Sequence, residues 1–260
     1  MITRYACWMD GQGLQDIDPA LLILDIAESA PDTEVRTAAA PISGTRVTGL
    51  ARRSLTVTVT FAVRETSPVR RAAVLERVAA WAQGTRLAVG HRPGQQLRCL
   101  CTTLPAASAL KWTAPLTVAF TAFASPYWES DHAACAWITP AACAGSAVLT
   151  PVGTAPAVPA EALVINQSGE TVNTLRLSCG DTSFDFRDLA LSGGERLLID
   201  HDDHGRLRMM IHGQTSRSVM DKRTPDSADE LLAICRRGNA VTVQSDAPVT
   251  VKFTARGRFL

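Results

Sequence analysis

The regular alternation of apolar and hydroxyl side chains in residues 54–64, SLTVTVTFAVR, constrains the fold of this chain more than any other feature. One side of the pattern consists of Leu55, Val57, Val59, Phe61 and Val63. The other side carries Thr56, Thr58 and Thr60. A period of two with many β-branched residues is typical of a half-buried strand. Residues 97–102 and 116–123 repeat the pattern and predict further strands of an antiparallel sheet.

One amphipathic helix is expected between these strands. Ser67 fits the N-cap and Pro68 the first helical position, where its missing N–H costs nothing. An apolar stripe at helical spacing follows, consisting of Val74, Leu75, Val78, Trp81 and Ala82. Gly84 is expected to end the helix in a left-handed conformation. The order predicts one helix that covers one face of an antiparallel sheet.

Residues Glu28–Arg53 contain two prolines, two glycines and few large apolar side chains. Such a segment cannot build much core, so we expect a long loop or a projecting hairpin. Compact domains rarely keep a segment of this kind without a use for it.

A second domain is expected after a linker. Residues 131–160 are rich in proline and alanine, which favours an extended connection between a domain over residues 1–130 and another over 161–260. The last segment predicts a β-sandwich of short strands: 162–166, 173–178, 183–186, 196–200, 207–211, 240–244 and 249–255. Ser227–Cys235 predicts one or two helical turns, and the last strand is expected to return to the first domain. The fold class is therefore mainly β, with an N-terminal antiparallel sandwich or barrel-like domain that carries one helix.

Composition excludes several classes of function. Lys and Arg total 26 against 25 Asp and Glu, a net charge of +1, which argues against a nucleic-acid-binding module. No apolar run approaches the ~18 residues of a membrane span, and the N-terminal residues lack the pattern of a secretory signal. Seven cysteines without regular spacing predict reduced thiols rather than a disulfide framework.

Candidate catalytic and metal-binding groups are few. The cluster His201-Asp202-Asp203-His204 could supply metal ligands, but its place before Gly205 predicts a hairpin tip, where adjacent side chains diverge. Cys99 and Cys101 are expected on one strand face, where packing explains them better than redox or zinc chemistry. No nucleophile, metalloprotease or phosphate-loop motif occurs in the sequence. We therefore expect no enzyme activity, no cofactor and no metal.

Tyr127 and Trp128 follow the strand 116–123 directly and allow two interpretations. They form either an aromatic corner that closes the strand, after Pro126, or anchors of a protein interface. The two interpretations are compatible.

Several segments of residues 1–130 together resemble the distal tail protein family of long, non-contractile-tailed bacteriophages. They are WMDG at 8–11, GTRVTGL at 44–50, AWA at 80–82 and FTAFASPYW at 120–128. The strand that ends in PYW after such a helix is the most specific of them. Residues 161–260 are similar to the second domain of the family, a galectin-like sandwich, in pattern more than in motif.

The resemblance implies a structural protein of the virion. Members of the family form a hexameric ring at the tip of the tail tube, whose N-terminal domains line the ring while the second domains point outward. The implied partners are further copies of the chain, the tail tube protein and tail-tip or tail-associated proteins; a contact with the tape measure protein is left open. DNA passes through the ring without sequence-specific binding, no membrane takes part, and assembly takes place in the host cytoplasm. The family supplies no catalytic, cofactor or metal position.

Three basic residues of the segment Glu28–Arg53 are the expected partners in ion pairs between subunits: Arg46, Arg52 and Arg53. A solvated loop with incidental charge remains the alternative. Two other functions compete with the ring. A carbohydrate-binding module is disfavoured because residues 150–260 contain no Trp or Tyr, and a metal-dependent hydrolase would depend on the 201–204 cluster.

Overall fold

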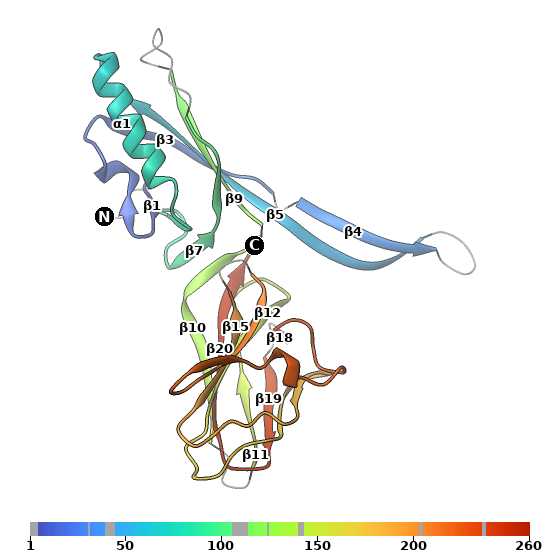
Figure 1. Cartoon of the computed structure of the whole chain (residues 1–260). Coiled ribbons are helices and arrows are strands. Elements are labelled where there is room, and N and C mark those ends of the chain that lie inside the picture. The colour runs from blue at the N-terminus through green and yellow to red at the C-terminus, as the bar shows by residue number, and fades with distance from the viewer. Residues whose placement is uncertain are drawn as a thin grey trace. The chain divides into compact units, whose positions relative to one another are not determined.

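The chain divides into two compact units. The computed structural model describes residues 5–30, 32–39, 45–105, 114–123, 125–139, 143–202, 205–235 and 238–260. The first unit comprises Met1–Glu129 with Leu260, and the second comprises Ser130–Phe259 (Figure 1). Both are built mainly from antiparallel strands. Within the described ranges, no helix has the length and apolar character that crossing a membrane requires.

The first sheet of the first unit has the strand order β2-β1-β6-β7. Its strands are β1 (Cys7–Met9), β2 (Gln12–Gly13), β6 (Arg86–Val89) and β7 (Gln95–Arg98). Asp10 and Gly11 form a two-residue turn between β1 and β2, with φ of 49° and 86°. The Asp10 carboxylate accepts hydrogen bonds from the backbone N–H groups of Thr85 and Arg86, which ties this turn to β6.

The second sheet of this unit has the order β3-β5-β9-β8. Its strands are β3 (Leu21–Glu28), β5 (Thr45–Val63), β8 (Leu100–Thr103) and β9 (Leu116–Ala122). The alternation in β5 is confirmed, because its apolar side is buried and its threonine side is half-exposed. A short 3-10 helix, Leu14–Asp16, precedes β3.

The helix α1 (Pro68–Trp81) covers the apolar face of the second sheet. The Ser67 hydroxyl accepts a hydrogen bond from the backbone N–H of Arg70, so the expected N-cap is confirmed. The Trp81 ring meets Phe120 of β9 edge-on, with centroids 5.7 Å apart. The left-handed stop at Gly84 was wrong, because Gly84 has no positive φ. A Cβ there would instead collide with the Met9 and Asp10 side chains.

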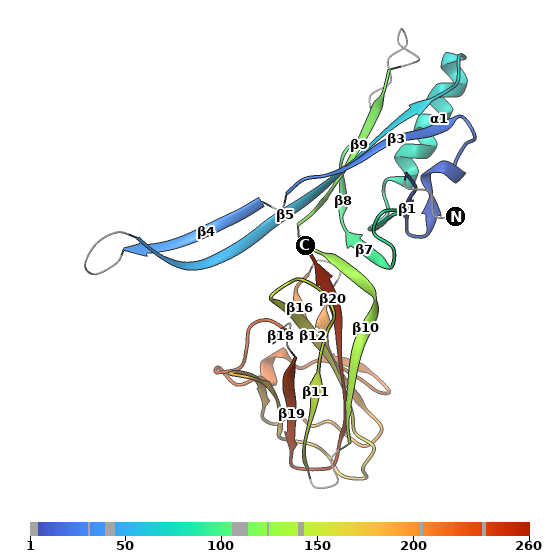
Figure 2. The same cartoon turned by 180° about the vertical axis from the view of Figure 1, so that it is seen from behind.

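The segment Glu28–Arg53 forms a hairpin. Strand β4 (Asp32–Ala39) pairs with the first half of β5 from Asp32 opposite Ser54 to Ala39 opposite Thr45. Two register shifts interrupt the ladder. Figure 2 shows β4 and this part of β5 extending away from the other strands of the unit. Of the two expected forms, loop or hairpin, the structure has the hairpin.

The single strand expected at 97–102 is wrong. Residues 95–98 belong to β7 and 100–103 to β8, and these strands lie in different sheets. The chain passes between the sheets at Cys99, which is buried, whereas Cys101 is partly exposed. An unbroken run of alternating residues cannot reveal such a crossing, since each half fits its own sheet.

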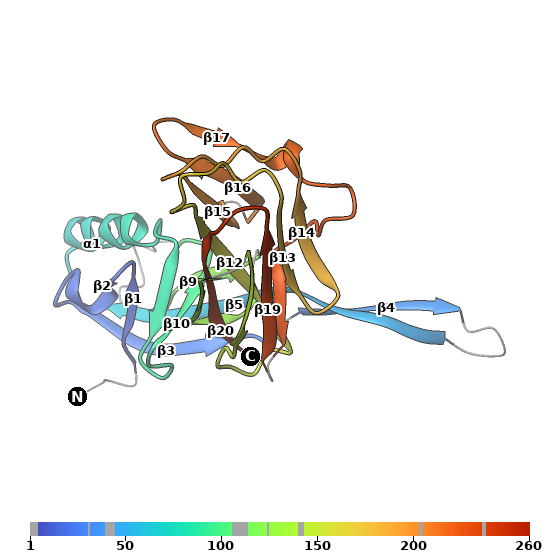
Figure 3. The same cartoon turned by 90° about the horizontal axis from the view of Figure 1, so that it is seen from below.

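The second unit is a pair of sheets (Figure 3). One has the order β17-β16-β15-β12-β20-β10, with β18 also paired to β12, and the other has the order β11-β19-β13-β14. Their bounds are β10 (Trp128–Ile138), β11 (Ala144–Leu149), β12 (Ala157–Ile165), β13 (Leu175–Cys179), β14 (Thr182–Phe186), β15 (Arg196–His201), β16 (Leu207–His212), β17 (Ser216–Ser218), β18 (Leu232–Cys235), β19 (Asn239–Ser245) and β20 (Thr250–Phe259). Phe184, Phe186 and Phe253 are buried in the core. The seven strands expected in residues 161–260 are all present.

Three expectations for the second half differ from the structure. Residues 131–160 hold most of β10, all of β11 and the start of β12, so they are part of the sheets rather than an extended linker. Ser227–Cys235 ends in the strand β18 and contains no helical turn. The last strand, β20, pairs with β12 of its own unit along Thr250–Ala255, and only the residue after it, Leu260, belongs to the first unit. Short alanine-rich strands with prolines between them give a weak pattern of alternation, and this is why residues 131–160 were expected to form a linker.

The mainly β fold class is confirmed. The named strand pairs are antiparallel, and none of the sheets closes into a barrel in the part of the chain that is described. The first unit is therefore a pair of open sheets with one helix and a long hairpin.

Candidate interaction surfaces

The hairpin β4–β5 brings together some of the residues expected at a subunit interface. Arg53 forms an ion pair of 2.8 Å with Glu34 of the opposite strand, and both side chains are exposed. The Arg52 guanidinium lies 5.5 Å from the centroid of the Tyr127 ring, a cation–π contact. Arg46 lies in β5 opposite Ala38, but its side chain falls outside the described part of the structure.

A half-buried carboxylate lies where the hairpin leaves the sheet. Glu28 ends β3, and its side chain is only 16% exposed. Arg92 Nη2 lies 2.7 Å from Glu28 Oε2, His91 Nε2 lies 2.5 Å from Oε1, and the Trp128 indole N–H donates to Oε2 at 3.1 Å. Burial alone would raise the pKa of Glu28, but the bonds from Arg92, His91 and Trp128 outweigh it and hold the pKa below its ordinary value. We call Glu28, His91, Arg92 and Trp128 the Glu28 cluster.

The two aromatic residues after β9 have different positions. Trp128 is fully buried, with the Arg92 guanidinium 5.2 Å from its ring centroid. Its side chain is therefore part of the first unit's own core and is not accessible to another chain. Tyr127 is partly exposed beside Arg52. The aromatic-corner interpretation describes Trp128, and Tyr127 stays a predicted interface residue.

The face of the β3-β5-β9-β8 sheet opposite α1 is lined by small, mostly uncharged side chains. In register it carries Thr56, Thr58, Thr60 and Ala62 of β5, Thr117, Ala119 and Thr121 of β9, and Leu22, Asp25 and Ala27 of β3. The hydroxyl of Thr121 lies 3.1 Å from those of Thr56 and Thr102, which links three strands. We call this the threonine face.

Apolar side chains mark both edges of the threonine face. Leu22 and Leu24 on β3 are 37% and 41% exposed, and Leu100 on β8 is 59% exposed. Among the described strands, β3 pairs along Leu21–Glu28 with β5 alone and β8 pairs with β9 alone. Each edge strand therefore presents unpaired backbone groups along one side.

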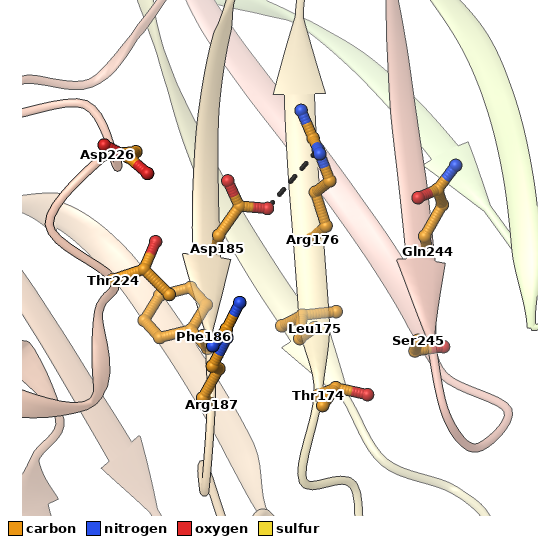
Figure 4. A pocket seen from close by; sticks show the side chains of 10 residues that line it. All are labelled: Thr174, Leu175, Arg176, Asp185, Phe186, Arg187, Thr224, Asp226, Gln244 and Ser245. Carbon is orange, nitrogen blue, oxygen red and sulfur yellow. Dashed lines mark ion pairs between the residues drawn. The ribbon is translucent and has the colours of Figure 1, made fainter.

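A hollow of about 450 Å³ lies on the β13, β14 and β19 strands of the second unit (Figure 4). Arg176 lies between Asp185 and Gln244 in register, and its Nε is 3.3 Å from Asp185 Oδ1. Phe186 lines the hollow but is only 2% exposed. Its ring is not accessible for the stacking that sugar recognition uses, so this hollow does not support the carbohydrate-binding alternative.

The other groups singled out in the sequence form no larger constellation. His201 contacts Glu230 at 3.3 Å, while Asp203 and His204 lie outside the described residues. Within the described ranges, no three His, Cys, Asp or Glu side chains gather as metal ligands would. All seven cysteines are free thiols, and burial raises the pKa of Cys7 and of Cys99 to about 12. A raised pKa disfavours the nucleophilic thiolate.

Two features escaped the sequence interpretation. The Glu28 cluster joins residues far apart in the chain, and nothing local to any of them signals the others. Trp137 on β10 is 55% exposed, but the expected linker placed it outside both domains. Residues 134–138, ACAWI, are all apolar, so no alternation with polar residues signalled which face of a strand Trp137 would occupy.

Comparison with known proteins gives a match by structure only. No protein-family model matches the chain, and no curated protein sequence does. The crystal structure of the Dit protein (gp 19.1) of SPP1, described as a paradigm of the hub adsorption apparatus of phages that infect Gram-positive bacteria, is similar with a TM-score of 0.66 and 14% identity. The likeness covers 96% of this chain and 98% of that one. The baseplate of phage P2 in its activated conformation with Ca gives a TM-score of 0.49 and 8% identity, over 92% and 90% of the two chains. The expected resemblance is thus confirmed for the fold: this chain folds as a phage distal tail protein does.

Proposed function

We propose that the chain is a structural protein of a bacteriophage tail, a hub that joins the tail tube to the tail-tip apparatus. The observation that carries the proposal is the likeness to SPP1 Dit over 96% of the chain, because it extends through both units rather than one common domain. In this proposal the protein binds other proteins and performs no catalysis.

The open sheet of the first unit supports assembly into a ring. Among the strands that the structure describes, its two edges, β3 and β8, have no further pairing partner, and apolar side chains lie at both. Contact between the β3 edge of one copy and the β8 edge of the next would be heterologous, and such contacts close into a ring when the rotation allows it. The exposed leucines Leu22, Leu24 and Leu100 would then be buried.

The hairpin supports the same proposal. None of its side chains that the structure describes is buried, and its ladder runs on for eight residues of β4. The cation–π pair Arg52–Tyr127 and the ion pair Arg53–Glu34 hold it within one chain. We propose that it reaches a neighbouring copy and that Arg46, Arg52, Arg53 and Tyr127 take part in that contact.

The proposed assembly is a homohexamer in the virion. Its partners are the tail tube protein on one side and the tail-tip or tail-associated proteins on the other. DNA would pass through the ring without sequence-specific binding, which agrees with a net charge of +1. We also propose that the second unit is a galectin-like domain of this hub protein.

The mass of the purified full chain in solution tests this function. We expect particles with six times the mass of the 27.8 kDa chain by analytical ultracentrifugation, and rings in negative-stain micrographs. A chain that stays monomeric at high concentration, with no rings, would contradict the proposal. Antibodies against the chain should label one end of the tail in intact particles, and label elsewhere would count against the hub role.

A further inference from the structure

A row of apolar side chains crosses the outer face of the larger sheet in the second unit. In register, Lys252 of β20 lies opposite Leu163 of β12, Leu163 opposite Leu198 of β15, and Leu198 opposite Met210 of β16. Trp137 of β10 extends the row, since Lys252 Nζ lies 5.4 Å from the centroid of its ring. We call Trp137, Leu163, Leu198 and Met210 the cross-strand row.

The cross-strand row faces away from the core. Trp137 is 55% exposed, and the other three side chains of the row are half-buried. Their chain neighbours Val164, Leu197 and Met209 point to the opposite face and are fully buried. Apolar side chains gathered on a sheet face outside the core are typical of an interaction surface, and Trp and Met are enriched in such surfaces.

The charges beside the row are unequal on its two sides. On one side Asp200 forms an ion pair of 2.6 Å with Arg208, opposite in register, and the exposed Glu161 lies on the same face two residues before Leu163, so this side carries a net negative charge. On the other side Arg196 lies opposite His212. No ion pair to Arg196 or Lys252 occurs among the described residues. The surface therefore combines apolar side chains with Lys252, which lies between Trp137 and Leu163, and with a flank that is basic at Arg196.

We propose that the cross-strand row docks an amphipathic α-helix of another protein, with aliphatic side chains against the row and carboxylates against Arg196 and Lys252. The row lies on a sheet face and not at an edge, so an added strand could not pair its backbone there, whereas a helix satisfies its own. Four steps between neighbouring strands span about 19 Å, the length of a helix of about 13 residues.

Two other occupants fit these observations less well. Sugars stack on aromatic rings, and three of the four members of the row are Leu or Met. A second copy of the chain, face to face, would bring together two faces on which Arg196, Arg208 and Lys252 outnumber Asp200 and Glu161, and like charges disfavour such a contact. An acidic helix avoids both difficulties. The inference does not depend on ring formation.

Two synthetic helical peptides of equal length test this proposal. Both carry the same aliphatic face, and the flanking positions are Glu in one and Lys in the other. Fluorescence anisotropy measures their binding to the full-length protein. We expect the Glu peptide to bind at least about tenfold more tightly than the Lys peptide at low salt, with the difference reduced at high salt.

Matched variants locate the binding. Leu198→Glu places a carboxylate in the middle of the row and should weaken binding of the Glu peptide by about tenfold or more. Val148→Glu is the control, because Val148 is 70% exposed on β11 of the other sheet and should leave binding unchanged. Should Leu198→Glu fail to fold, as judged by circular dichroism, the exposed Trp137→Ala replaces it with the same expectation.

Several outcomes would overturn the proposal. They are no binding of the Glu peptide, equal binding of both peptides, or equal effects of the substitutions at 198 and 148. Self-association that Leu198→Glu abolishes would assign the row to a second copy. Binding on a glycan array that Trp137→Ala abolishes would assign it to a sugar.

Discussion

The two units differ in how completely the faces of their sheets are buried. In the second unit, two sheets share a core, and the described side chains between them are largely buried, as Leu177, Val243 and Phe253 are. In the first unit, the β3-β5-β9-β8 sheet buries one face under α1 and leaves the threonine face half-exposed. The second unit thus completes its own core, while the first carries a half-exposed sheet face and an extended hairpin, none of whose described side chains is buried.

This difference has a physical consequence for how each unit responds to change. A unit that completes its core depends on packing, so the loss of buried volume should affect it most. A surface that is exposed in one chain and becomes buried only against a partner contributes little to the stability of that chain but much to assembly. Substitutions in the two regions should therefore separate stability from assembly.

Removal of the hairpin should have the largest effect, the loss of assembly. Residues 34–51 can be replaced by Asn-Gly, because Thr33 and Arg52 are opposite in register and a two-residue turn can join them. We expect rings to disappear in negative stain while the far-ultraviolet circular dichroism still reports a folded chain. Replacing residues 213–215 of the β16–β17 turn by Asn-Gly is the matched control and should leave rings intact. Rings that survive the first deletion would remove the hairpin from the interface.

Loss of a core aromatic should have the next largest effect. Phe253→Ala removes a fully buried ring from the second unit and should lower the free energy of unfolding by about 3–5 kcal/mol. Phe123→Ala in the first unit is the control, since this ring is 58% exposed and should cost less than about 0.5 kcal/mol. Urea denaturation measures both. Equal costs would mean that the second unit does not depend on packing as we describe.

Neutralising Glu28 should lower the free energy of unfolding less than the loss of a core ring does, but more than the loss of a surface charge does. Glu28→Gln keeps the shape but removes the charge that holds Arg92 and His91, at a cost of about 1.5–3 kcal/mol in the free energy of unfolding. Glu76→Gln on the exposed side of α1 is the matched control and should change it by less than about 0.5 kcal/mol. Urea denaturation at neutral pH makes the comparison. A result near zero for Glu28 would mean that the cluster does not stabilise the base of the hairpin.

Most of the local structure could be predicted from the sequence, because each part of it rests on neighbouring residues. The alternation in 54–64 and the Ser67-Pro68 start of α1 are such signals, and both are confirmed. The crossing at Cys99 could not be predicted, since the pattern continues unbroken through it. The expected linker was wrong because the prolines of 131–160 lie among short strands whose partners come from distant residues.

The candidate surfaces were predictable only in part. The hairpin segment was found because a long stretch without core residues is itself a local signal, and the Arg53 and Tyr127 side chains lie on or beside it. The Glu28 cluster and the cross-strand row depend on register between strands that are far apart in the chain, such as Leu163 with Leu198. A period of two indicates which residues share a face, but not which strand lies next to which.

Acid should weaken both units through carboxylates whose pKa is lowered by folding. In the first unit these include Glu28, and in the second Glu195, where the hydrogen bond from Arg217 is the main cause. A lowered pKa stabilises the fold above the ordinary value of 4.5, and this contribution is lost as the pH falls through the folded value. Glu28→Gln and Glu195→Gln should each lose less stability than the unchanged protein between about pH 6 and pH 3. Curves parallel to the unchanged protein would contradict the assignment for that residue.

Removal of Arg53 should have the smallest effect on stability. Its partner Glu34 and Arg53 itself are 38% and 63% exposed, so Arg53→Ala should leave the free energy of unfolding almost unchanged. The matched pair in the second unit is Arg217 with Glu195, whose side chain is 17% exposed; Arg217→Ala should cost about 1 kcal/mol after allowance for solvent screening. The ultracentrifuge then gives the informative contrast. If Arg53 contacts a neighbouring copy, Arg53→Ala should shift the ring toward smaller species although it hardly changes stability. Arg217→Ala should lower stability but leave the ring intact. A ring that tolerates Arg53→Ala would leave the contact between copies to other residues of the hairpin and to the leucines at the sheet edges.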